Sequence, residues 1–429
     1  MFTLPKNFLL GVATCATQIE GGDCAHTWAD WAARGGVKDG TSPERANDHW
    51  NRFAEDTALM SDLKIQIYRF GIEWARIEPV MGVFDEESIA HYREELLYLK
   101  RAGIQPLLTL HHFTNPLWFE QLGGFEKLEN KAHFLRFVEK AIRSFGDLVS
   151  EYITINEPNI YAVNGYFLGM WPPGKRSFSR AMQVMTVLTA CHIEAYSLIH
   201  RVRAELGFSD TKVSFANHLR VFDPANPKNI FHKACAHGLE TCFQAAMTKA
   251  MCLGKFSFPI GNPAHLKPGV YADFSAINYY TRSTISGFSD GVRKNAPVND
   301  LGWEIYPDGI VVCAKMMLHF LPDRPIYITE NGTCDTNDTF RCRYLYEHLK
   351  AIADSKLSIT RYYHWCFIDN FEWAEGESAR FGIVHVDYPT QTRSTKQSGL
   401  FYQKIIEQHG VTEEMYRTYV AGVRYPGEQ

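Results

Sequence analysis

Two glutamates, Glu157 and Glu330, each end a short apolar, β-prone run. The first run reads YITINEPN over residues 152–159, and the second reads YITENG over residues 327–332. A pair of carboxyl groups brought to one place can divide acid–base and nucleophilic work. One, protonated, donates to a leaving oxygen, while the other, ionised, meets an electron-poor carbon. Cleavage of a glycosidic bond requires this combination.

Carboxyl groups so far apart in the sequence meet only if the fold brings strand ends together. Short apolar runs alternate with amphipathic helical stretches, and such strands pair in parallel through right-handed crossovers. Because eight such strands can close into a barrel and no linker interrupts the pattern, we predict an α/β fold. The predicted fold is a single catalytic (β/α)8 TIM-barrel domain over residues 1–429, with long βα loops that form the active-site mouth. The predicted strands cover residues 8–16, 65–74, 104–113, the run ending at Glu157, 212–218, 273–280, 325–332 and 359–370.

Two stretches show the helical pattern most clearly. ESIAHYREELLYLKRAG places Ile89, Tyr92, Leu96 and Leu99 on one face and ends at Gly103, a glycine suited to a helix C-terminus. NKAHFLRFVEKAIRSFG repeats the spacing and leads straight into the strand that ends at Glu157. Its predicted buried face consists of Phe134, Phe137, Val138, Ala141, Ile142 and Phe145.

Polar residues gather where the predicted strands end. In a (β/α)8 barrel these ends converge on one face, and active sites are built there. Approach to solvent alone would also make strand ends polar, but the restriction to Gln, His, Asn, Glu, Arg and aromatic residues favours a shared pocket. The residues are Gln18, Arg69, His111, His112, Asn156, Glu157, Asn217, Asn278, Tyr280, Glu330, Trp365, Asn370 and Glu372.

Arg69 and Tyr280 are expected near one of the two carboxyl groups. A cation and a hydrogen-bond donor both favour the ionised form, so that group would be the nucleophile. The other group feels the negative charge of the first and would hold a proton near neutral pH. Once the nucleophile has reacted its charge disappears, and the second group can act as a base toward water.

At these motifs the sequence resembles glycoside hydrolase family 1, the retaining β-glucosidases and their relatives. The resemblance covers essentially the whole chain and implies a retaining exo-β-glycosidase, with β-glucosidase as the first expectation. β-Galactosidase or β-fucosidase activity and a transglycosylating member of the family remain alternatives. Besides TINEPN and YITENG, the matching stretches are FLLGVATCATQIEGG, DHWNRFAEDTALM, YRFGIEWARIEP, TLHHF, GYFLGMWPPG, DFSAINYYTR, GWEIYPDGI and WCFIDNFEWAEGESARFGIVHVDY.

The resemblance also implies roles for individual residues. Glu157 corresponds to the general acid/base and Glu330 to the nucleophile. Directional hydrogen bonds to sugar hydroxyls suit Gln, His, Asn and Glu, and a Trp face suits the C–H surface of a sugar ring. The implied glycon-binding residues are Gln18, His112, Asn156, Trp365, Glu372 and Trp373, with Arg69, Asn278 and Tyr280 around the nucleophile. No metal and no cofactor are implied.

Glu372 and Glu157 narrow the substrate class. Family members that act on 6-phosphorylated sugars are expected to carry a phosphate-binding stretch where this chain has DNFEW, and a carboxylate there would repel phosphate. Non-phosphorylated glycosides are therefore expected. Glu157 argues against the thioglucosidase-like relatives, which carry Gln at this position. Because both glutamates are present, a non-catalytic sugar-binding barrel is the weaker alternative.

The aglycone side departs from the family pattern. Asn159 stands where an aromatic residue often follows Asn-Glu-Pro, and the stretch between the fifth and sixth predicted strands, residues 220–272, is shorter than expected. Trp171 and Trp303 are candidates to line the entrance. Leaving-group preference is therefore the part of the function that the sequence predicts least.

Composition excludes several other function classes. A formal net charge of -4 with interspersed signs provides no basic stripe for nucleic acid and no polybasic membrane anchor. The apolar N-terminus has only Lys6 as an early cation, so it is predicted to be a strand rather than a signal peptide. Ten irregularly spaced cysteines indicate reduced thiols. We expect a cytoplasmic enzyme whose partner is a small-molecule or oligosaccharide β-glycoside; the sequence does not indicate an oligomeric state.

Overall fold

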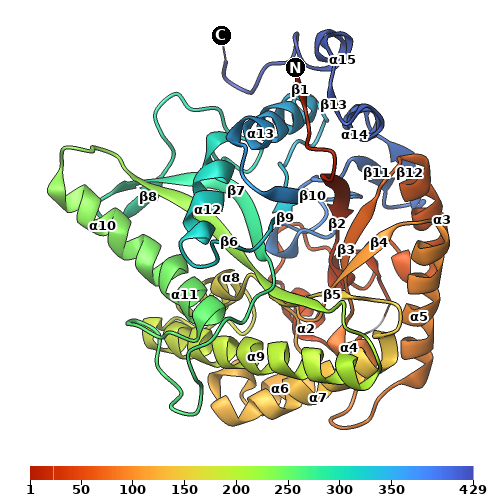
Figure 1. The fold of residues 1–429 in the computed structure, drawn as a ribbon, viewed down its shortest axis with the longest axis vertical. Helices are drawn as coiled ribbons and strands as arrows, with labels where there is room; N and C mark the ends of the chain where they lie inside the picture. Colours follow the sequence, from red (N-terminus) through yellow and green to blue (C-terminus); the bar gives the residue numbers. More distant parts are fainter. Residues whose placement is uncertain (23, 429) are drawn as a thin grey trace.

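The computed structural model describes residues 1–22 and 24–428. In this part of the chain eight parallel strands form a closed barrel surrounded by helices (Figure 1), which confirms the predicted (β/α)8 architecture. Neighbouring strands follow the order β6-β5-β4-β3-β2-β10-β9-β7, and pairing between β6 and β7 closes the ring. The barrel strands are β2 (Leu9–Ala13), β3 (Ile67–Gly71), β4 (Gln105–Thr109), β5 (Glu151–Asn156), β6 (Lys212–Pro224), β7 (Ser275–Ser286), β9 (Ile326–Asn331) and β10 (Ile359–Trp365).

The strands are apolar because helices cover the outside of the barrel and side chains fill its inside. Every residue of β3, β5 and β9 is buried. Parallel strands that are buried on both faces appear in a sequence as continuous apolar runs, and this property made the eight strands predictable.

The two helices with the clearest sequence pattern form as predicted. α5 (Glu86–Arg101) begins after Asp85, whose carboxylate accepts the backbone N–H groups of Glu87 and Ser88. The predicted apolar face of α5 is buried, and so are all six residues of the predicted face of α7 (Lys131–Phe145). These faces pack against the barrel and hold the strands in register.

Other elements complete the outer layer and the loops. The longest is α9 (Phe178–Glu205). The remaining helices are α1 (Ala16–Ile19), α2 (Thr27–Ala33), α3 (His49–Asp62), α4 (Trp74–Ile77), α6 (Leu117–Gln121), α8 (Pro158–Ala162), α10 (Ile230–Glu240), α11 (Ala246–Leu253), α12 (Asp308–Leu318), α13 (Arg341–Ser355), α14 (Gln397–Gln408) and α15 (Glu413–Tyr419). Short turns of other helix types are η1 (Gly124–Glu126), η2 (Leu128–Asn130), η3 (Val163–Leu168), η4 (Thr241–Ala245) and η5 (Trp373–Glu375). Short strands outside the barrel wall are β1 (Phe2–Thr3), β8 (Ser289–Gly291), β11 (Val384–Asp387), β12 (Thr392–Thr395) and β13 (Gly410–Val411).

Two barrel strands run further than the sequence predicts. β6 continues to Pro224 and β7 to Ser286, and beyond the barrel they still pair, for example Val221 with Arg282. β8 then adds an antiparallel strand to β7. Charged residues in these extensions, such as Asp223, obscure the apolar pattern of a strand. The stretch after His218 therefore begins as part of the sheet and not as a loop.

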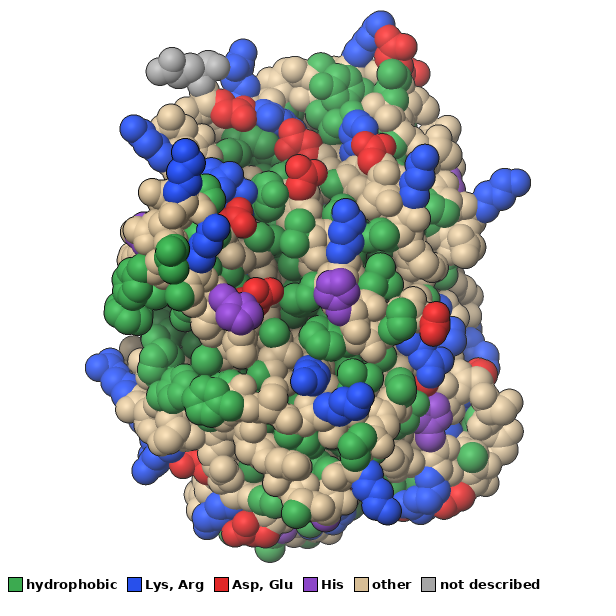
Figure 2. Space-filling model, turned by 60° about the vertical axis from the view of Figure 1, so that its left-hand side comes forward, with side chains coloured by type: hydrophobic (Ala, Val, Ile, Leu, Met, Phe, Trp, Pro, Cys, Tyr) green, Lys and Arg blue, Asp and Glu red, His purple; other side chains and the backbone are tan. Residues whose placement is uncertain are grey.

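The outer surface mixes charges of both signs. On the face shown in Figure 2, Lys and Arg side chains are interspersed with Asp and Glu, and hydrophobic side chains gather toward its left edge. Among the described residues, no helix combines the length and hydropathy needed to cross a membrane.

Candidate active site

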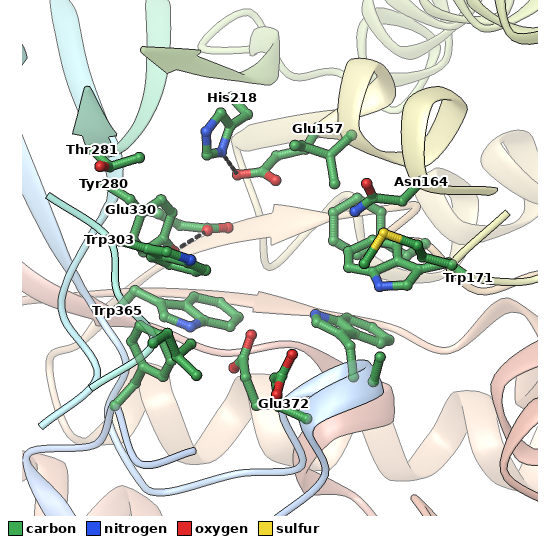
Figure 3. A pocket seen from close by; sticks show the side chains of 18 of the residues that line it. Glu157, Asn164, Trp171, His218, Tyr280, Thr281, Trp303, Glu330, Trp365 and Glu372 are labelled. Carbon is green, nitrogen blue, oxygen red and sulfur yellow. Dashed lines mark hydrogen bonds and ion pairs between the residues drawn. The ribbon is translucent and has the colours of Figure 1, made fainter. Parts of the chain in front are cut away.

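A cavity of about 310 Å³ opens where the barrel strands end at their carboxyl side. Figure 3 shows the carboxyl groups of Glu157, Glu330 and Glu372 pointing toward the same central space. Both Glu157 and Glu330 are buried, with 6% and 3% of their surface exposed. The lining residues are His112, Phe113, Glu157, Ile160, Asn164, Met170, Trp171, His218, Arg220, Tyr280, Thr281, Leu301, Trp303, Glu330, Trp365, Glu372, Trp373, Ala374, Glu375 and Phe381.

Glu330 near the end of β9 receives two strong donors. Arg69 from β3 places Nη1 2.5 Å from Oε1, and the Tyr280 hydroxyl from β7 donates to Oε2 at 2.6 Å. Each carboxylate oxygen thus has its own donor, one of them charged. This arrangement fixes the orientation of the carboxyl group and favours its ionised form.

Glu157 occupies a sharp turn between β5 and α8. Its φ angle is +39°, a left-handed conformation that is uncommon for a residue with a side chain and costs about 1–3 kcal/mol. Pro158 follows at the first helical position, and the Glu157 backbone N–H donates to Ala216 O at 2.6 Å. Such strain persists where the surroundings enforce it, and it is concentrated at functional sites. Here it turns the carboxyl group into the cavity.

An amide network joins the two glutamates. Asn278 Nδ2 lies 2.9 Å from both Glu157 Oε1 and Asn156 Oδ1, and Asn156 Oδ1 also accepts from Arg69 Nη2 at 2.6 Å. The pairing of β7 with β9 aligns Asn278 with Glu330. One rigid set of hydrogen bonds therefore positions both carboxyl groups.

Burial raises the pKa of Glu330 from 4.5 to about 7. The Arg69 charge opposes this rise, the Glu157 carboxyl group adds to it, and the hydrogen bond from Tyr280 lowers it again. The two donors, Arg69 and Tyr280, thus counter part of the cost of burying the Glu330 carboxylate.

The opposite wall carries Gln18 and Glu372. Gln18 Nε2 donates to Phe371 O at 2.8 Å and lies 3.3 Å from Glu372 Oε2, which fixes both side chains. Burial raises the pKa of Glu372 to about 8, and the charge of Glu330 contributes to this rise. Gln18 Oε1 and His112 Nδ1 are buried and have no hydrogen-bond partner within the described part of the chain. Buried polar atoms are normally satisfied, so these two are suited to bind a polar ligand.

Comparison with known proteins identifies the chain. The sequence model of Glycosyl hydrolase family 1 matches residues 1–264 and 264–411. The chain belongs to this family.

Named relatives of this family 1 enzyme align over nearly its whole length. Beta-glucosidase A of Thermotoga maritima is 30% identical, with 95% of this chain and 99% of the relative covered. The 1,4-beta-D-glucan glucohydrolase of Thermotoga neapolitana is 29% identical, with 96% and 100% covered. These matches confirm the resemblance inferred from the sequence and support a hydrolase.

Solved structures of relatives share the fold. A beta-glycosidase from Pyrococcus horikoshii superposes with a TM-score of 0.88 at 32% identity, covering 97% of this chain and 98% of that chain. The beta-glucosidase from Thermotoga maritima in complex with deoxynojirimycin gives a TM-score of 0.88 at 28% identity, covering 96% and 100%. The TIM-barrel fold of the family 1 enzyme is therefore confirmed.

Most residues singled out in the sequence of the family 1 enzyme lie in or directly behind the cavity. Four lie one layer behind the wall and hydrogen-bond to lining residues or to one another: Gln18, Arg69, Asn156 and Asn278. The other predicted residues line the cavity: Glu157, Glu330, His112, Tyr280, Trp365, Glu372, Trp373, Trp171 and Trp303.

His111, Asn217 and Asn370, which were also expected in the shared pocket, do not line the cavity, and Asn159 requires a correction as well. It does not line the cavity; it is fully buried, and its amide donates to His218 O at 2.8 Å and accepts from His218 N at 3.3 Å. The side chain ties α8 to β6. Its orientation follows from the sharp turn at Glu157, which the sequence pattern does not reveal.

Aromatic side chains form the mouth of the cavity. Trp373, Trp171 and Phe113 pack against one another, with ring centroids 5.0 to 5.9 Å apart. Trp303 packs edge-on against Tyr280 at 5.8 Å. The mouth is thus apolar while the base is polar, as suits a ligand with a polar end and an apolar end.

His218 and Arg220 on β6 line the cavity but were not predicted as site residues. His218 Nδ1 lies 3.4 Å from Glu157 Oε1. The signal in the sequence was their spacing of two, which places both side chains on one side of a strand. It was missed because the strand was predicted to end at His218.

No metal site is found in residues 1–22 and 24–428. Groups of three or more His, Cys, Asp or Glu side chains arranged to hold an ion are absent from this part of the chain.

Proposed function

We propose that this family 1 enzyme, acting as one catalytic domain, is a retaining exo-β-glucosidase that hydrolyses non-phosphorylated β-D-glucosides. The observation that carries the proposal is the pair of buried carboxyl groups. Glu330 is held by Arg69 and Tyr280, and Glu157 faces the same cavity, where its hydrogen-bond partners among the described residues are the neutral side chains of Asn278 and His218. The asymmetry suits one nucleophile and one acid/base.

In the first half-reaction Glu330 attacks the anomeric carbon of the bound glycoside. The bond from this carbon to the leaving oxygen breaks as Glu157 gives its proton to that oxygen, and an alcohol is released. Arg69 and Tyr280 keep the Glu330 oxygens aimed and ionised until the covalent glycosyl-enzyme forms. Glu330 loses its negative charge when this covalent bond forms.

In the second half-reaction Glu157, now a carboxylate, takes a proton from a water molecule. The water oxygen attacks the anomeric carbon, and the bond to Glu330 breaks. Two inversions at one carbon restore the original β configuration. Because the neighbouring charge is absent from the covalent intermediate, Glu157 can serve as the base in this step and as the acid in the first.

The polar base of the cavity supports binding of an unmodified sugar. His112 and Glu372 on the wall offer hydrogen-bonding groups, Gln18 lies directly behind Glu372, and Trp365 and Trp373 add flat apolar faces. A 6-phosphate would bring negative charge toward the Glu330 carboxylate, and the Glu372 carboxyl group would offer it no compensating cation. Electrostatic repulsion in a buried site therefore disfavours phosphorylated substrates.

The specificity among β-glycosides and the compartment are further parts of the proposal. Galactosides and fucosides differ from glucosides only in groups that the polar base contacts, so weaker activity on them is expected. Alcohols or sugars that bind at the aromatic mouth could replace water and give transglycosylation. No disulfide joins any two of the described residues, which supports a reducing compartment such as the cytoplasm.

A screen of aryl β-glycosides on the wild type, Glu330→Ala and Glu157→Ala tests the proposal. We expect the wild type to prefer glucosides over galactosides, fucosides and 6-phosphoglucosides, and Glu330→Ala to lose turnover on all of them. Glu157→Ala should lose about 10²–10⁴-fold on substrates with poor leaving groups and much less on activated ones. Replacement of the exposed Glu413 by Ala is the control and should leave the rates unchanged.

Two results would contradict this proposal. Near-normal turnover by Glu330→Ala would remove the nucleophile assignment, and exclusive cleavage of 6-phosphoglucosides would overturn the substrate class. Product analysis with an added alcohol then measures how much of the flux goes to transfer instead of hydrolysis. Absence of any turnover by the wild type would favour the sugar-binding barrel.

A further inference from the structure

The ring of His218 is clamped beside Glu157. It is buried, lies nearly parallel to the Tyr280 ring at 5.9 Å with an interplanar angle of 11°, and meets Phe243 edge-on at 5.9 Å. These two contacts restrict the plane of the ring. Its Nδ1 points at Glu157 Oε1 (Figure 3), 3.4 Å away.

Arg220 determines which ring nitrogen of His218 carries the proton. Its Nε and Nη2 lie 3.3 and 3.1 Å from His218 Nε2. A guanidinium group only donates hydrogen bonds, so Nε2 must accept. In the neutral ring the proton is then on Nδ1, and Nδ1 donates toward Glu157.

Arg220 is itself held in place. Its Nη1 lies 3.2 Å from Ser283 Oγ and 3.6 Å from Asp290 Oδ2, and its guanidinium group lies over the Phe243 ring at 5.2 Å. Burial lowers the pKa of His218; the Glu157 charge opposes this and the Arg220 charge adds to it. His218 is thus a neutral donor with a fixed tautomer.

We propose that His218, oriented by Arg220, is a positioning residue that donates a hydrogen bond to Glu157 and strengthens it as the catalytic acid. This inference rests on the proposed function, in which Glu157 protonates the leaving group. As Glu157 gives up its proton, negative charge develops next to Nδ1–H. A contact of 3.4 Å is long in the free enzyme, and catalytic hydrogen bonds of this kind tighten as the reaction proceeds.

Other charged or titratable groups also lie near Glu157 and His218. Glu330 on β9 and Glu372 on the loop after β10 face the same cavity, and the charge of Glu157 contributes to the raised pKa of each. Tyr280 from β7 donates to Glu330, and its hydroxyl is therefore not available to Glu157. His218 and the amide of Asn278 are the donors that reach Glu157 itself within the described chain.

The matched variants His218→Phe and His218→Asn separate hydrogen bonding from packing. Phe keeps a ring between Tyr280 and Phe243 but removes the donor, whereas Asn removes the ring but can place its amide N–H near the position of Nδ1. Profiles of kcat/KM against pH are measured with an alkyl β-glucoside and a dinitrophenyl β-glucoside. Phe222→Leu is the control, because its ring packs against Phe243 at a centroid distance of 5.7 Å, one step removed from His218.

On the alkyl glucoside, we expect His218→Phe to move the alkaline limb of the kcat/KM profile about one pH unit higher. We also expect it to lower kcat/KM about tenfold. Both effects correspond to the loss of one hydrogen bond to a carboxylate. The dinitrophenyl glucoside, which needs little acid assistance, should be hydrolysed at close to the wild-type rate. His218→Asn and Phe222→Leu should keep the wild-type limb. Arg220→Met should shift the limb in the same direction, but add nothing in the His218→Phe background, since it acts through His218.

An unmoved limb in His218→Phe, or an equal shift in His218→Asn, would overturn the role of His218 while leaving the proposed function intact. Equal losses on both substrates would also overturn it, because they would indicate a packing role. Failure of the wild type to hydrolyse either glucoside would instead overturn the proposed function and this role with it.

Discussion

Arg69 and Tyr280 reach one carboxyl group from two different barrel strands. Each donates to a different oxygen of Glu330, at 2.5 and 2.6 Å. Without them burial would raise the pKa of Glu330 further than about 7. The two donors therefore keep the group ionisable near neutral pH, although little of it touches solvent.

Replacement of Tyr280 by Phe should make the enzyme more sensitive to acid. The hydroxyl lowers the pKa of Glu330, so its loss raises that pKa, and the acidic limb of kcat/KM should move to higher pH. At neutral pH we expect a loss of roughly tenfold, the size of one hydrogen bond to a charged group. Tyr279→Phe is the matched control, because the Tyr279 hydroxyl donates to Tyr306 O at 2.5 Å. Equal limbs in the two variants would contradict this account of Tyr280.

Individual residues were predictable where their position followed from a strand end. Glu157 and Glu330 were predicted to face one pocket because each ends an apolar run, and both do. The orientation of Asn159 was not predictable, because it depends on the left-handed turn at Glu157. His218 was missed because its strand was predicted to end there, whereas β6 continues to Pro224.

At the scale of elements, α7 shows how an outer helix packs against α4 in the loop that follows β3. Phe137 is fully buried, and its ring stacks on Trp74 with a centroid distance of 5.2 Å and an interplanar angle of 20°. Phe137→Ala should destabilise the protein by about 3–5 kcal/mol through lost burial and a cavity. Urea unfolding followed by fluorescence measures the effect, and the remaining folded enzyme should keep its kcat.

Arg143→Ala on the same helix is the control for Phe137→Ala. Arg143 is exposed and pairs with Glu139 and Glu205 at the surface, so its loss should cost at most about 1 kcal/mol. If the two variants unfolded at the same urea concentration, packing of α7 against the barrel side could not be the source of stability.

Strands were predictable from the sequence where both of their faces are buried. The eight barrel strands are enclosed on both sides and gave continuous apolar runs. The extensions of β6 to Pro224 and of β7 to Ser286 leave the barrel and carry polar side chains such as Arg282, so no periodic pattern marked them. Each extension is a strand because it pairs with the other one, and the local sequence alone does not indicate this pairing.

At the scale of the whole molecule, the buried carboxyl groups of the active site lower the stability of the folded protein. Glu330 and Glu372 are buried close together, and burial raises the pKa of Glu372 from 4.5 to about 8. In the unfolded chain the same carboxyl group ionises freely. Below about pH 4.5 the carboxyl group is protonated in both the folded and the unfolded state, and its ionisation costs the folded protein no stability. As the pH rises from there through about 8, the unfolded state ionises first, and the free energy of unfolding falls progressively.

Glu372→Gln should for this reason stabilise the protein at high pH while impairing sugar binding. Gln cannot ionise, and its amide oxygen can still accept from Gln18. Since each pKa unit corresponds to about 1.4 kcal/mol, the variant should gain a few kcal/mol at pH 8 and almost nothing at pH 5. Thermal unfolding across this pH range measures the gain as a difference in Tm that grows with pH. The exposed Glu413→Gln should show no such growth, and a difference in Tm for Glu372→Gln that stayed constant or shrank with pH would mean that Glu372 is ionised in the folded protein well below pH 8.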